Sequence, residues 1–466
     1  MAEIVVLGGG ISGLATAYHI QDLALKEGVD VKLTLVEKEE RLGGKIMSVK
    51  EEGFLCEAGP AAFPDNTPET LVLARDLNLE IFKSNEAAKK RFIYTGNRLE
   101  KVPETPGEFF KSKILSWKGK LRVLLEPFTK PAVEEDETIA GFGERHLGIE
   151  AEEKLISALV VGIFAGDSRQ LSLKSCFPVM HELEKEGGGS LFKAMFKRMK
   201  KAKARKGAKI SAIPYGNLAS FNGGLESLTE ALEKTLQARI LKGKTVERVE
   251  KKIGQGYEVL LKDEKTHVKA NALVIALPAY AAAEVLKSLD AELSKTIGGI
   301  PYVPASVVCL GYHRDDVQHP LDGFGFLIPK KEGRRILGCR WDSSTFEERA
   351  PSGKVLLWTI VGGAINPGLS FLEDDALLTL VREELKDLLG LEKEPVFTRI
   401  FRHEKAIPQY MVGHEKRLEE MEGLLENHPG LFMTGNAFRG IGIKDCVKNA
   451  AMTARMVVDY VKGLDS

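Results

Sequence analysis

Short apolar runs separated by glycine-rich turns open the chain. Residues Ile4 to Leu7 lead directly into Gly8-Gly9-Gly10-Ile11-Ser12-Gly13, and a helical pattern follows from Leu14 to Lys26. A second apolar run extends from Val31 to Val36 and ends at Glu37. This alternation predicts two buried strands joined by a helix, the opening unit of a doubly wound α/β sheet.

Strand patterns return in the second half of the chain. Between Thr245 and Leu277 we expect a meander, with Val246 and Val249, then Tyr257 to Leu261 after a Gly254-Gln255-Gly256 turn, then Leu273 to Leu277. From Pro304 to Gly362 we expect a second, separate sheet. Its strands are Ser306 to Tyr312, Gly323 to Ile328, Ile336 to Arg340 and Val355 to Val361.

Helical periodicity dominates the region from Glu86 to Ala212, with amphipathic candidates at Thr138 to His146 and Glu152 to Phe164. We interpret this region as an inserted helical domain. Near the end of the chain, an apolar strand from Leu431 to Asn436 leads through Gly440-Ile441-Gly442-Ile443 into a predicted helix. This is a second strand–glycine–helix unit.

Composition narrows the class of protein. The 466 residues exceed the length that one core supports, so two or three domains are expected. Lysine and arginine together number 66, as do aspartate and glutamate, so the formal net charge is zero. The chain therefore has no overall positive charge that would attract nucleic acid. The five scattered cysteines favour a reducing cytoplasm and disfavour a disulfide framework or zinc site. We expect no signal peptide and no spanning helix, because Ala272 to Ala283 is short and contains Pro278.

The opening turn carries the chemistry of a dinucleotide site. Glycine at position 8 permits the tight turn, Gly10 lets backbone amides approach a pyrophosphate, and Gly13 lets the helix pack against the sheet. Glu37 falls where a carboxylate meets the adenosine ribose. The glycine pair in Arg41-Leu42-Gly43-Gly44-Lys45 lets the chain pass beside the cofactor. A glycine pattern alone would also suit an ordinary strand–helix turn.

Several segments together resemble the protoporphyrinogen oxidases, FAD enzymes of haem and chlorophyll synthesis related in fold to the monoamine oxidases. They are the opening fingerprint, Phe54 to Phe63, Val161 to Leu173, Ala406 to Leu418 and Thr434 to Val447. The resemblance runs from end to end of the chain. The last three segments are more specific than the first, which the wider flavin amine oxidase group shares.

The resemblance implies an α/β fold in three parts. A discontinuous Rossmann-like FAD-binding domain would take residues 1–60, 215–290 and 415–466. A mixed α+β substrate domain with a large sheet would take residues 61–85 and 291–414, and an inserted helical domain facing the membrane would take residues 86–214. These divisions agree with the changes of pattern along the chain.

The implied activity is FAD-dependent oxidation of protoporphyrinogen IX to protoporphyrin IX in haem biosynthesis. Hydride would pass repeatedly to flavin N5, and oxygen or another acceptor would reoxidise the flavin. Because the cofactor carries the chemistry, no catalytic side chain is assigned. Residues expected along FAD are Gly8, Gly9, Gly10, Ile11, Ser12, Gly13, Glu37, Lys38, Arg41, Gly44, Lys45, Gly59, Pro60, Val246, Ile441, Gly442 and Ile443.

Three residues are expected to bind substrate by the same resemblance. Arg91 would hold a propionate through parallel hydrogen bonds, and Leu327 and Phe346 would sandwich the macrocycle. Arg91 would otherwise be solvated surface, and Leu327 and Phe346 ordinary core residues. Ala61 and Ala62 follow Gly59-Pro60 where many relatives carry a polar residue and serine, so the resemblance carries over no polar side-chain contact at these two positions.

A basic run supplies a second candidate surface. From Lys193 to Lys209 there are nine lysines or arginines and no acidic residue, while Phe192, Met195, Phe196 and Met199 recur at helical spacing. Residues 192–209 therefore suit an interfacial helix on anionic lipid, giving a cytoplasmic protein that contacts the inner face of the cell membrane. A solvated helix or basic loop is the alternative interpretation.

Other functions stay open at this point. Coproporphyrinogen III would need more cationic partners than Arg91, and an amine oxidase or carotenoid desaturase would share the first fingerprint. A non-catalytic FAD-bearing scaffold, or a partner for hand-off to ferrochelatase, is a further hypothesis. Porphyrin fluorescence and reduction of the bound flavin by porphyrinogen separate these classes.

Overall fold

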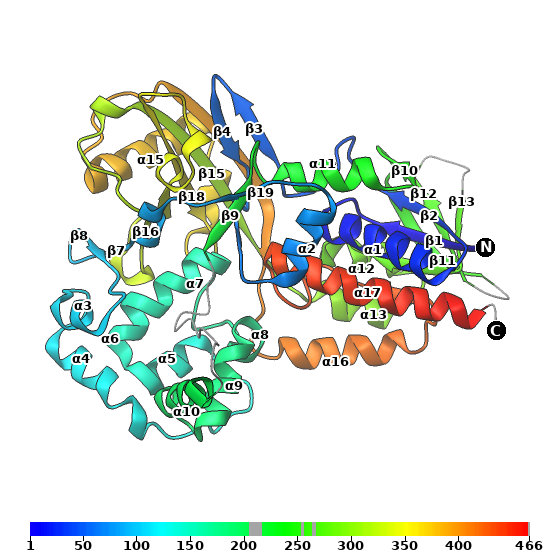
Figure 1. Ribbon diagram of the computed structural model, residues 1–466, viewed down its shortest axis with the longest axis horizontal. Coiled ribbons are helices and arrows are strands. Elements are labelled where there is room, and N and C mark those ends of the chain that lie inside the picture. Colours follow the sequence, from blue (N-terminus) through cyan, green and yellow to red (C-terminus); the bar gives the residue numbers. More distant parts are fainter. Residues whose placement is uncertain (205–216, 253–255, 263–266, 465–466) are drawn as a thin grey trace.

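The computed structural model describes residues 1–204, 217–252, 256–262 and 267–464, with side chains of the tenth α-helix described to residue 200. Figure 1 shows two sheet regions side by side and a lower lobe made of helices. The Gly254-Gln255 part of the predicted turn and the end of the basic run, from residue 205, lie outside the described residues.

A parallel five-stranded sheet joins distant parts of the chain. In sheet order its strands are β10 (Arg239–Leu241), β2 (Val31–Val36), β1 (Ala2–Leu7), β14 (Ala272–Ile275) and β20 (Leu431–Met433). Buried residues of this sheet pack with α1 (Ile11–Glu27), α2 (Pro68–Asp76), α11 (Glu226–Thr235) and α17 (Ile443–Leu464). The predicted opening strands and both strand–glycine–helix units are confirmed.

A three-stranded antiparallel meander packs with other buried residues of that sheet. Its strands are β11 (Val246–Lys251), β12 (Tyr257–Leu261) and β13 (His267–Ala270). The prediction that the apolar strand near Leu273 completes the meander is wrong, because β14 pairs with β1 and β20. A wholly apolar run suits a central parallel strand, and the polar-alternating β13 takes the meander position.

The second sheet has seven strands and is separate from the first, as predicted. In sheet order the strands are β19 (Phe397–Pro408), β15 (Tyr302–His313), β18 (Lys354–Gly362), β17 (Ile336–Trp341), β16 (Gly325–Leu327), β7 (Arg91–Thr95) and β8 (Arg98–Lys101). Helix α15 (Asp374–Leu389) packs against it in one hydrophobic cluster. The pair β7–β16 is parallel, whereas the other strand pairs are antiparallel.

Strands β7 and β8 correct the expectation of a mainly helical region from Glu86 onward. Gly96 and Asn97 both have positive φ, at 60° and 62°, which is the geometry of a tight hairpin turn. The β-favouring run Arg91–Thr95 before this turn therefore forms a strand. The substrate sheet gains two strands from a segment whose surroundings are helical.

Two small sheets connect the large ones. Strands β3 (Ser48–Glu51) and β4 (Phe54–Glu57) form a hairpin. Strand β9 (Leu218–Phe221) pairs with β5 (Phe63–Pro64) and β6 (Ile81–Lys83). The chain therefore crosses between the sheets next to the predicted Gly59-Pro60 segment.

The lower lobe contains short helices and matches the predicted helical patterns. Thr138 caps α5 (Ile139–Leu147) by accepting a hydrogen bond from the Gly141 N–H. The second pattern begins as a π-helical turn (Glu152–Ile156) and continues as α7 (Ser157–Phe164). The other helices there are α3 (Pro106–Lys111), α4 (Trp117–Leu124), α6 (Ile149–Ala151), α8 (Leu173–Cys176), α9 (Pro178–Gly187) and α10 (Leu191–Ala204).

The remaining helices connect strands of the two large sheets. They are α12 (Ala279–Leu286), α13 (Ala291–Gly298), α14 (Asp342–Thr345) and α16 (His414–Leu425). Among the helices in the described ranges, none is long and apolar enough to cross a bilayer.

Candidate functional site

The turn between β1 and α1 has the shape that a diphosphate requires. A Cβ at Gly13 would lie 1.9 Å from the Gly8 carbonyl oxygen, so only glycine allows this approach of helix to strand. A Cβ at Gly10, in contrast, would meet no heavy atom within 4 Å. Gly10 precedes α1 without a side-chain cap, so no cap side chain takes up the first N–H groups of the helix.

Glu37 lies against this turn at the end of β2. Its Oε2 atom accepts a hydrogen bond from the Gly9 N–H at 2.7 Å, and Oε1 accepts one from the Glu39 N–H at 2.9 Å. The carboxylate is therefore held beside the glycines, and its predicted contact with a ribose stays a prediction. Neighbouring Lys38 is exposed and pairs with Glu39 at 3.2 Å.

The segment from Arg41 to Lys45 folds back onto the turn. The Gly43 N–H donates to the Gly9 carbonyl at 2.8 Å, and Gly43 also forms a bridge with Gly10. The Arg41 guanidinium donates to protein acceptors, including the Ile46 carbonyl and Glu226, both at 2.8 Å. The bonds from Nη1 therefore hold the Arg41 side chain against its own segment and α11.

The Gly59-Pro60 segment lies beside Lys45. A Cβ on Gly59 would lie 3.1 Å from the Lys45 carbonyl oxygen, so the two segments are in close contact. Preceding Ala58 offers its carbonyl oxygen to His403 Nε2 at 2.8 Å. Pro60 itself is exposed. Three segments predicted to follow the cofactor are therefore in contact in turn: the turn at Gly9, the segment that ends at Lys45, and Gly59.

Sequence analysis missed the buried ion pair beneath this segment. Glu57 is fully buried and its Oε1 accepts a hydrogen bond from Arg349 at 2.7 Å. Burial raises the Glu57 pKa, and the Arg349 charge opposes this shift. Glu57 also accepts bonds from Ser48 Oγ and the Leu225 N–H. No sequence signal could have paired residues so distant in the chain.

The C-terminal unit brings a further glycine turn to the same sheet. The Thr434 hydroxyl is buried and has no hydrogen-bond partner among the described residues. Asp445 Oδ2 accepts a hydrogen bond from the Gly442 N–H at 3.2 Å at the start of α17, and burial raises the Asp445 pKa. Ile443 is buried, while Ile441 packs in the cluster that contains Phe164 and Tyr410.

Val246 lies near Glu37 through main-chain contacts. The Lys244 N–H donates to the Glu37 carbonyl at 2.9 Å, two residues before Val246 begins β11. The Val246 side chain is half-buried and packs against the cluster that includes Val36. The residues predicted for the adenosine half of the cofactor are therefore neighbours.

Arg91 and Leu327 share one pair of strands in the seven-stranded sheet. Arg91 is opposite Gly325 in the β7–β16 register, and Leu327 is opposite Ile93. Arg91 is exposed, and its guanidinium lies 5.8 Å from the Phe324 ring centroid. Leu327 is half-buried, and its Cδ1 would lie 2.6 Å from a Cβ placed on Gly162 of α7.

Phe346 belongs to a different element. It follows α14, is 4% exposed, and places its ring 6.2 Å from Phe82 and 5.3 Å from the Arg349 guanidinium. The structure thus places Arg91 and Leu327 on adjacent strands, two register positions apart, and puts Phe346 in the core beside the Glu57–Arg349 pair. An accessible wall at Phe346 would require these contacts to open.

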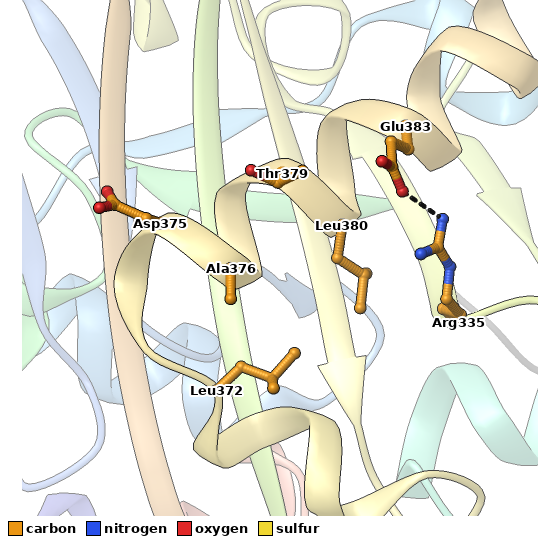
Figure 2. Close-up of a pocket in the computed structure, with 7 residues that line it drawn as sticks. All are labelled: Arg335, Leu372, Asp375, Ala376, Thr379, Leu380 and Glu383. Carbon is orange, nitrogen blue, oxygen red and sulfur yellow. Dashed lines mark hydrogen bonds and ion pairs between the residues drawn. The ribbon is translucent and has the colours of Figure 1, made fainter.

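A separate pocket of about 440 Å³ lies at α15 (Figure 2). Arg335 pairs with Glu383 there at 3.0 Å. The lining residues are Arg335, Leu372, Asp375, Ala376, Thr379, Leu380 and Glu383. None of them is among the residues predicted for cofactor or substrate. Within the described part of the chain, no group of three or more histidine, cysteine, aspartate or glutamate residues could hold a metal ion.

Comparison with known proteins defines the class. The sequence pattern of the family described as flavin containing amine oxidoreductase matches residues 11–458. The chain belongs to this family, and its fold is the FAD-binding fold of flavin amine oxidases with mixed α/β sheets. It is an oxidoreductase that uses FAD, so the predicted enzyme class and cofactor are confirmed.

Within this family, the chain is similar over its whole length to porphyrinogen oxidases. The chain is 31% identical over 472 residues to the coproporphyrinogen III oxidase of Bacillus subtilis (strain 168), covering 98% of each protein. It is 32% identical over 485 residues to the protoporphyrinogen oxidase of Homo sapiens, again covering 98% of each. A solved structure from Exiguobacterium sp. 255-15, described as a candidate protoporphyrinogen oxidase, matches with TM-score 0.82, 26% identity and 98% coverage of each chain. The predicted family resemblance is confirmed.

Proposed function

We propose that this chain oxidises protoporphyrinogen IX to protoporphyrin IX in haem biosynthesis, with FAD as the oxidant. The observation that carries the proposal is similarity over the whole chain, including 32% identity across 98% of the human protoporphyrinogen oxidase. Such coverage extends beyond the cofactor domain, because it includes the seven-stranded sheet and the lower lobe. A likeness of the cofactor fold alone would carry less weight, because one fold hosts many functions.

The residues around the turn fit FAD. The open space at Gly10 and the uncapped N-terminus of α1 suit the diphosphate, and Glu37 suits the ribose. Gly59 and Pro60, with Ile441, Gly442 and Ile443, would border the flavin, where the unpartnered Thr434 hydroxyl is also found. When bound, the flavin supplies a hydride acceptor.

The protein's part in the reaction is to orient the macrocycle. Exposed Arg91 would hold a propionate, and Leu327 on the adjacent strand would provide an apolar wall. Burial of the substrate between apolar side chains would exclude water from the reacting carbon. Phe346 is proposed as the second wall, with the rearrangement its buried position requires. Oxygen is the proposed final acceptor.

Coproporphyrinogen III is the second candidate substrate, and the Bacillus subtilis relative favours it. Its additional propionates would need further cations near Arg91. Lys90 is adjacent and pairs with Asp322 across the sheet edge, so it could exchange that carboxylate for a propionate.

Turnover of both porphyrinogens by the purified protein, followed by porphyrin fluorescence, tests the proposal. We expect a higher kcat/KM for protoporphyrinogen IX. A higher value for coproporphyrinogen III would select the second candidate. If neither porphyrinogen is oxidised, an amine oxidase or carotenoid desaturase activity becomes the favoured hypothesis.

The lower lobe is proposed to face a membrane. The division into three domains is proposed with it: an FAD-binding domain (1–60, 215–290 and 415–466), a substrate domain (61–85 and 291–414) and the helical domain (86–214). The apolar face of α4 and the turn after it supports this proposal. Its side chains are exposed although apolar: Trp117 72%, Leu121 60%, Leu124 45%, Leu125 47% and Phe128 80%. Exposed lysines flank this α4 face, namely Lys111, Lys113, Lys118 and Lys130.

Helix α10 adds the first part of the 192–209 run to the same lobe. Phe196 is 69% exposed and Met199 is 46% exposed. Buried Glu126 joins the two surfaces, because it follows α4 and accepts hydrogen bonds from the Leu191 and Phe192 N–H groups of α10. Apolar faces with cationic flanks suit anionic lipid. A peripheral position at the cytoplasmic face would also suit hand-off of the product to ferrochelatase.

A further inference from the structure

The β3–β4 hairpin packs on one face of the seven-stranded sheet. Phe54 of the hairpin and Ala58 just after it lie in one hydrophobic cluster with residues of this sheet, among them Val307 of β15. The pair Gly59-Pro60, proposed to border the flavin, directly follows Ala58. The cofactor segment and the sheet proposed to bind substrate therefore meet immediately before this pair.

Two polar side chains project from the same face of the sheet. Trp358 of β18 lies opposite Cys309 of β15, and His403 of β19 lies opposite Ala305 of β15. Directly opposite residues share a face, and so do residues four apart on one strand, because side chains alternate along a strand. Trp358 and His403 therefore point toward the hairpin from two strands that β15 separates.

Each of the two side chains donates one hydrogen bond to the main chain of the cofactor segment. Trp358 Nε1 donates to the Glu57 carbonyl at 2.8 Å, and His403 Nε2 donates to the Ala58 carbonyl at 2.8 Å. A carbonyl oxygen only accepts, so His403 carries a proton on Nε2. The Ala58 N–H donates in turn to the Met47 carbonyl at 2.9 Å. The peptide groups on both sides of Ala58 are therefore held.

The Glu57 side chain fixes the same point independently. Its fully buried carboxylate accepts hydrogen bonds from Arg349, the Ser48 hydroxyl and the Leu225 N–H. Only Ala58 lies between this anchored residue and the glycine–proline pair. The indole and imidazole bonds therefore determine where that pair begins.

We propose that Trp358 and His403 are positioning residues that hold Gly59-Pro60 against the flavin of FAD. This inference rests on the proposed placement of the cofactor and goes beyond it, because it assigns that placement to two side chains of the substrate sheet. Arg91 and Leu327 belong to the same sheet. One sheet would therefore set the positions of flavin and substrate relative to each other, as hydride transfer requires.

Titration of FAD-free variants with FAD, followed by flavin fluorescence, tests the proposal. Trp358→Phe removes the indole N–H and keeps a ring for the Arg340 guanidinium, which lies 4.3 Å from the Trp358 ring centroid. His403→Leu removes the imidazole donor. We expect each change to raise the FAD Kd about threefold to tenfold, the effect of losing one hydrogen bond. The absorbance spectrum of the bound flavin should also move toward that of free FAD.

Two further variants separate positioning from general stability. His403→Gln keeps an N–H donor for the Ala58 carbonyl, so it should restore most of the FAD affinity and the flavin spectrum. Tyr257→Phe is the matched control, because the Tyr257 hydroxyl donates to the Pro429 carbonyl at 2.9 Å, before β20 and so at the opposite end of the parallel sheet from the glycine turn. It should lower the thermal midpoint and leave the FAD Kd unchanged.

A purely structural role gives a different result. The thermal midpoint would then fall in Trp358→Phe and His403→Leu, while the FAD Kd and the flavin spectrum remained those of the unaltered chain. That result would overturn the proposal. Equal weakening of FAD binding by Tyr257→Phe, or failure of His403→Gln to restore affinity, would overturn it as well. Circular dichroism confirms that each variant is folded.

The outcome is separable from that for the substrate, because no porphyrinogen is used. If the variants bind FAD as described while neither porphyrinogen is oxidised, the inference stands and the proposed function fails. If porphyrin forms but the variants bind FAD like the unaltered chain, the proposed function stands and the inference fails. If the unaltered chain binds no FAD, both fail.

Discussion

Arg91 and Lys45 have no carboxylate partner among the residues that the structure describes, whereas many other arginines and lysines are ion-paired. An unpaired cation near a binding site is available for an anionic ligand. Lys45 is among the residues proposed for the cofactor, and Arg91 is among those proposed for the substrate. Lys120 of α4 also bonds to main-chain carbonyls and not to a carboxylate, so the lack of an acidic partner supports a role only for a residue that also lies at the proposed site.

Arg91→Ala tests the substrate side. We expect KM for a propionate-bearing porphyrinogen to rise about tenfold to a hundredfold, because a charge-assisted hydrogen bond contributes about 1.5–3 kcal/mol. Steady-state kinetics measure the change, and the FAD content should stay constant. Arg98→Ala is the control, since Arg98 is exposed on the adjoining strand and pairs with Glu100. Equal KM values in the Arg91 variant and the unaltered protein would remove Arg91 from the site.

Elements show which parts of the fold the sequence could predict. The β1–α1 turn was predictable because each glycine meets a local steric requirement, such as the approach of Gly13 to the Gly8 carbonyl. Strands β7 and β8 were not, since a short hairpin inside a helical region has too few residues to establish a period. The third strand of the meander was also wrongly predicted. Its pairing with β12 depends on contacts between strands, which the local sequence pattern does not show.

Two glycine substitutions separate fold from cofactor binding at that turn. Gly13→Ala should destabilise the protein, because its Cβ would lie 1.9 Å from a backbone oxygen. Gly10→Ala should leave the thermal midpoint of the FAD-free protein almost unchanged, yet weaken FAD binding at least about tenfold by filling the space proposed for the diphosphate. Thermal unfolding and FAD titration measure the two effects.

Gly423→Ala in α16 is the matched control, since its Cβ would also meet nothing within 4 Å. It should alter neither FAD affinity nor the fold. If Gly10→Ala bound FAD as tightly as this control does, the diphosphate could not lie at the turn.

Helix α4 shows why periodicity alone did not reveal its exposed face. Lys120 is 5% exposed and donates hydrogen bonds to the Phe110 and Ser112 carbonyls, whereas Trp117 is 72% exposed. The Lys120 ammonium also lies 4.7 Å from the Trp117 ring centroid. This helix buries a cation and exposes an aromatic ring, the reverse of the usual amphipathic arrangement.

Replacing Trp117, Leu121 and Phe128 together by serine tests the α4 face. We expect the unaltered protein to co-sediment with anionic lipid vesicles at low salt and the triple variant to bind several-fold more weakly. Met452→Ser with Met456→Ser, on exposed positions of α17, provides the control. Equal vesicle binding by the triple variant and the control would exclude the α4 face, and so would an unaltered protein that binds no vesicles.

The whole molecule depends on contacts between segments far apart in the chain. Glu57, in the β3–β4 hairpin, pairs with Arg349, which lies shortly after Phe346 in the chain. Arg349 also donates a hydrogen bond to Ser220, so three distant segments meet at this pair. The pair lies in the core, and removal of one partner from a buried pair costs about 3–5 kcal/mol. Sequence patterns predicted the separate sheets and the cofactor turn, but not this pair, because its partners carry no local signal.

The most direct test of the account is anaerobic mixing of the purified, FAD-loaded protein with protoporphyrinogen IX, followed by absorbance. We expect loss of the oxidised flavin absorbance on anaerobic mixing, because each flavin accepts one hydride, and formation of porphyrin only after oxygen is admitted to reoxidise the flavin for the remaining cycles. A yellow protein whose flavin stays oxidised, or a colourless protein that FAD cannot reconstitute, would contradict it.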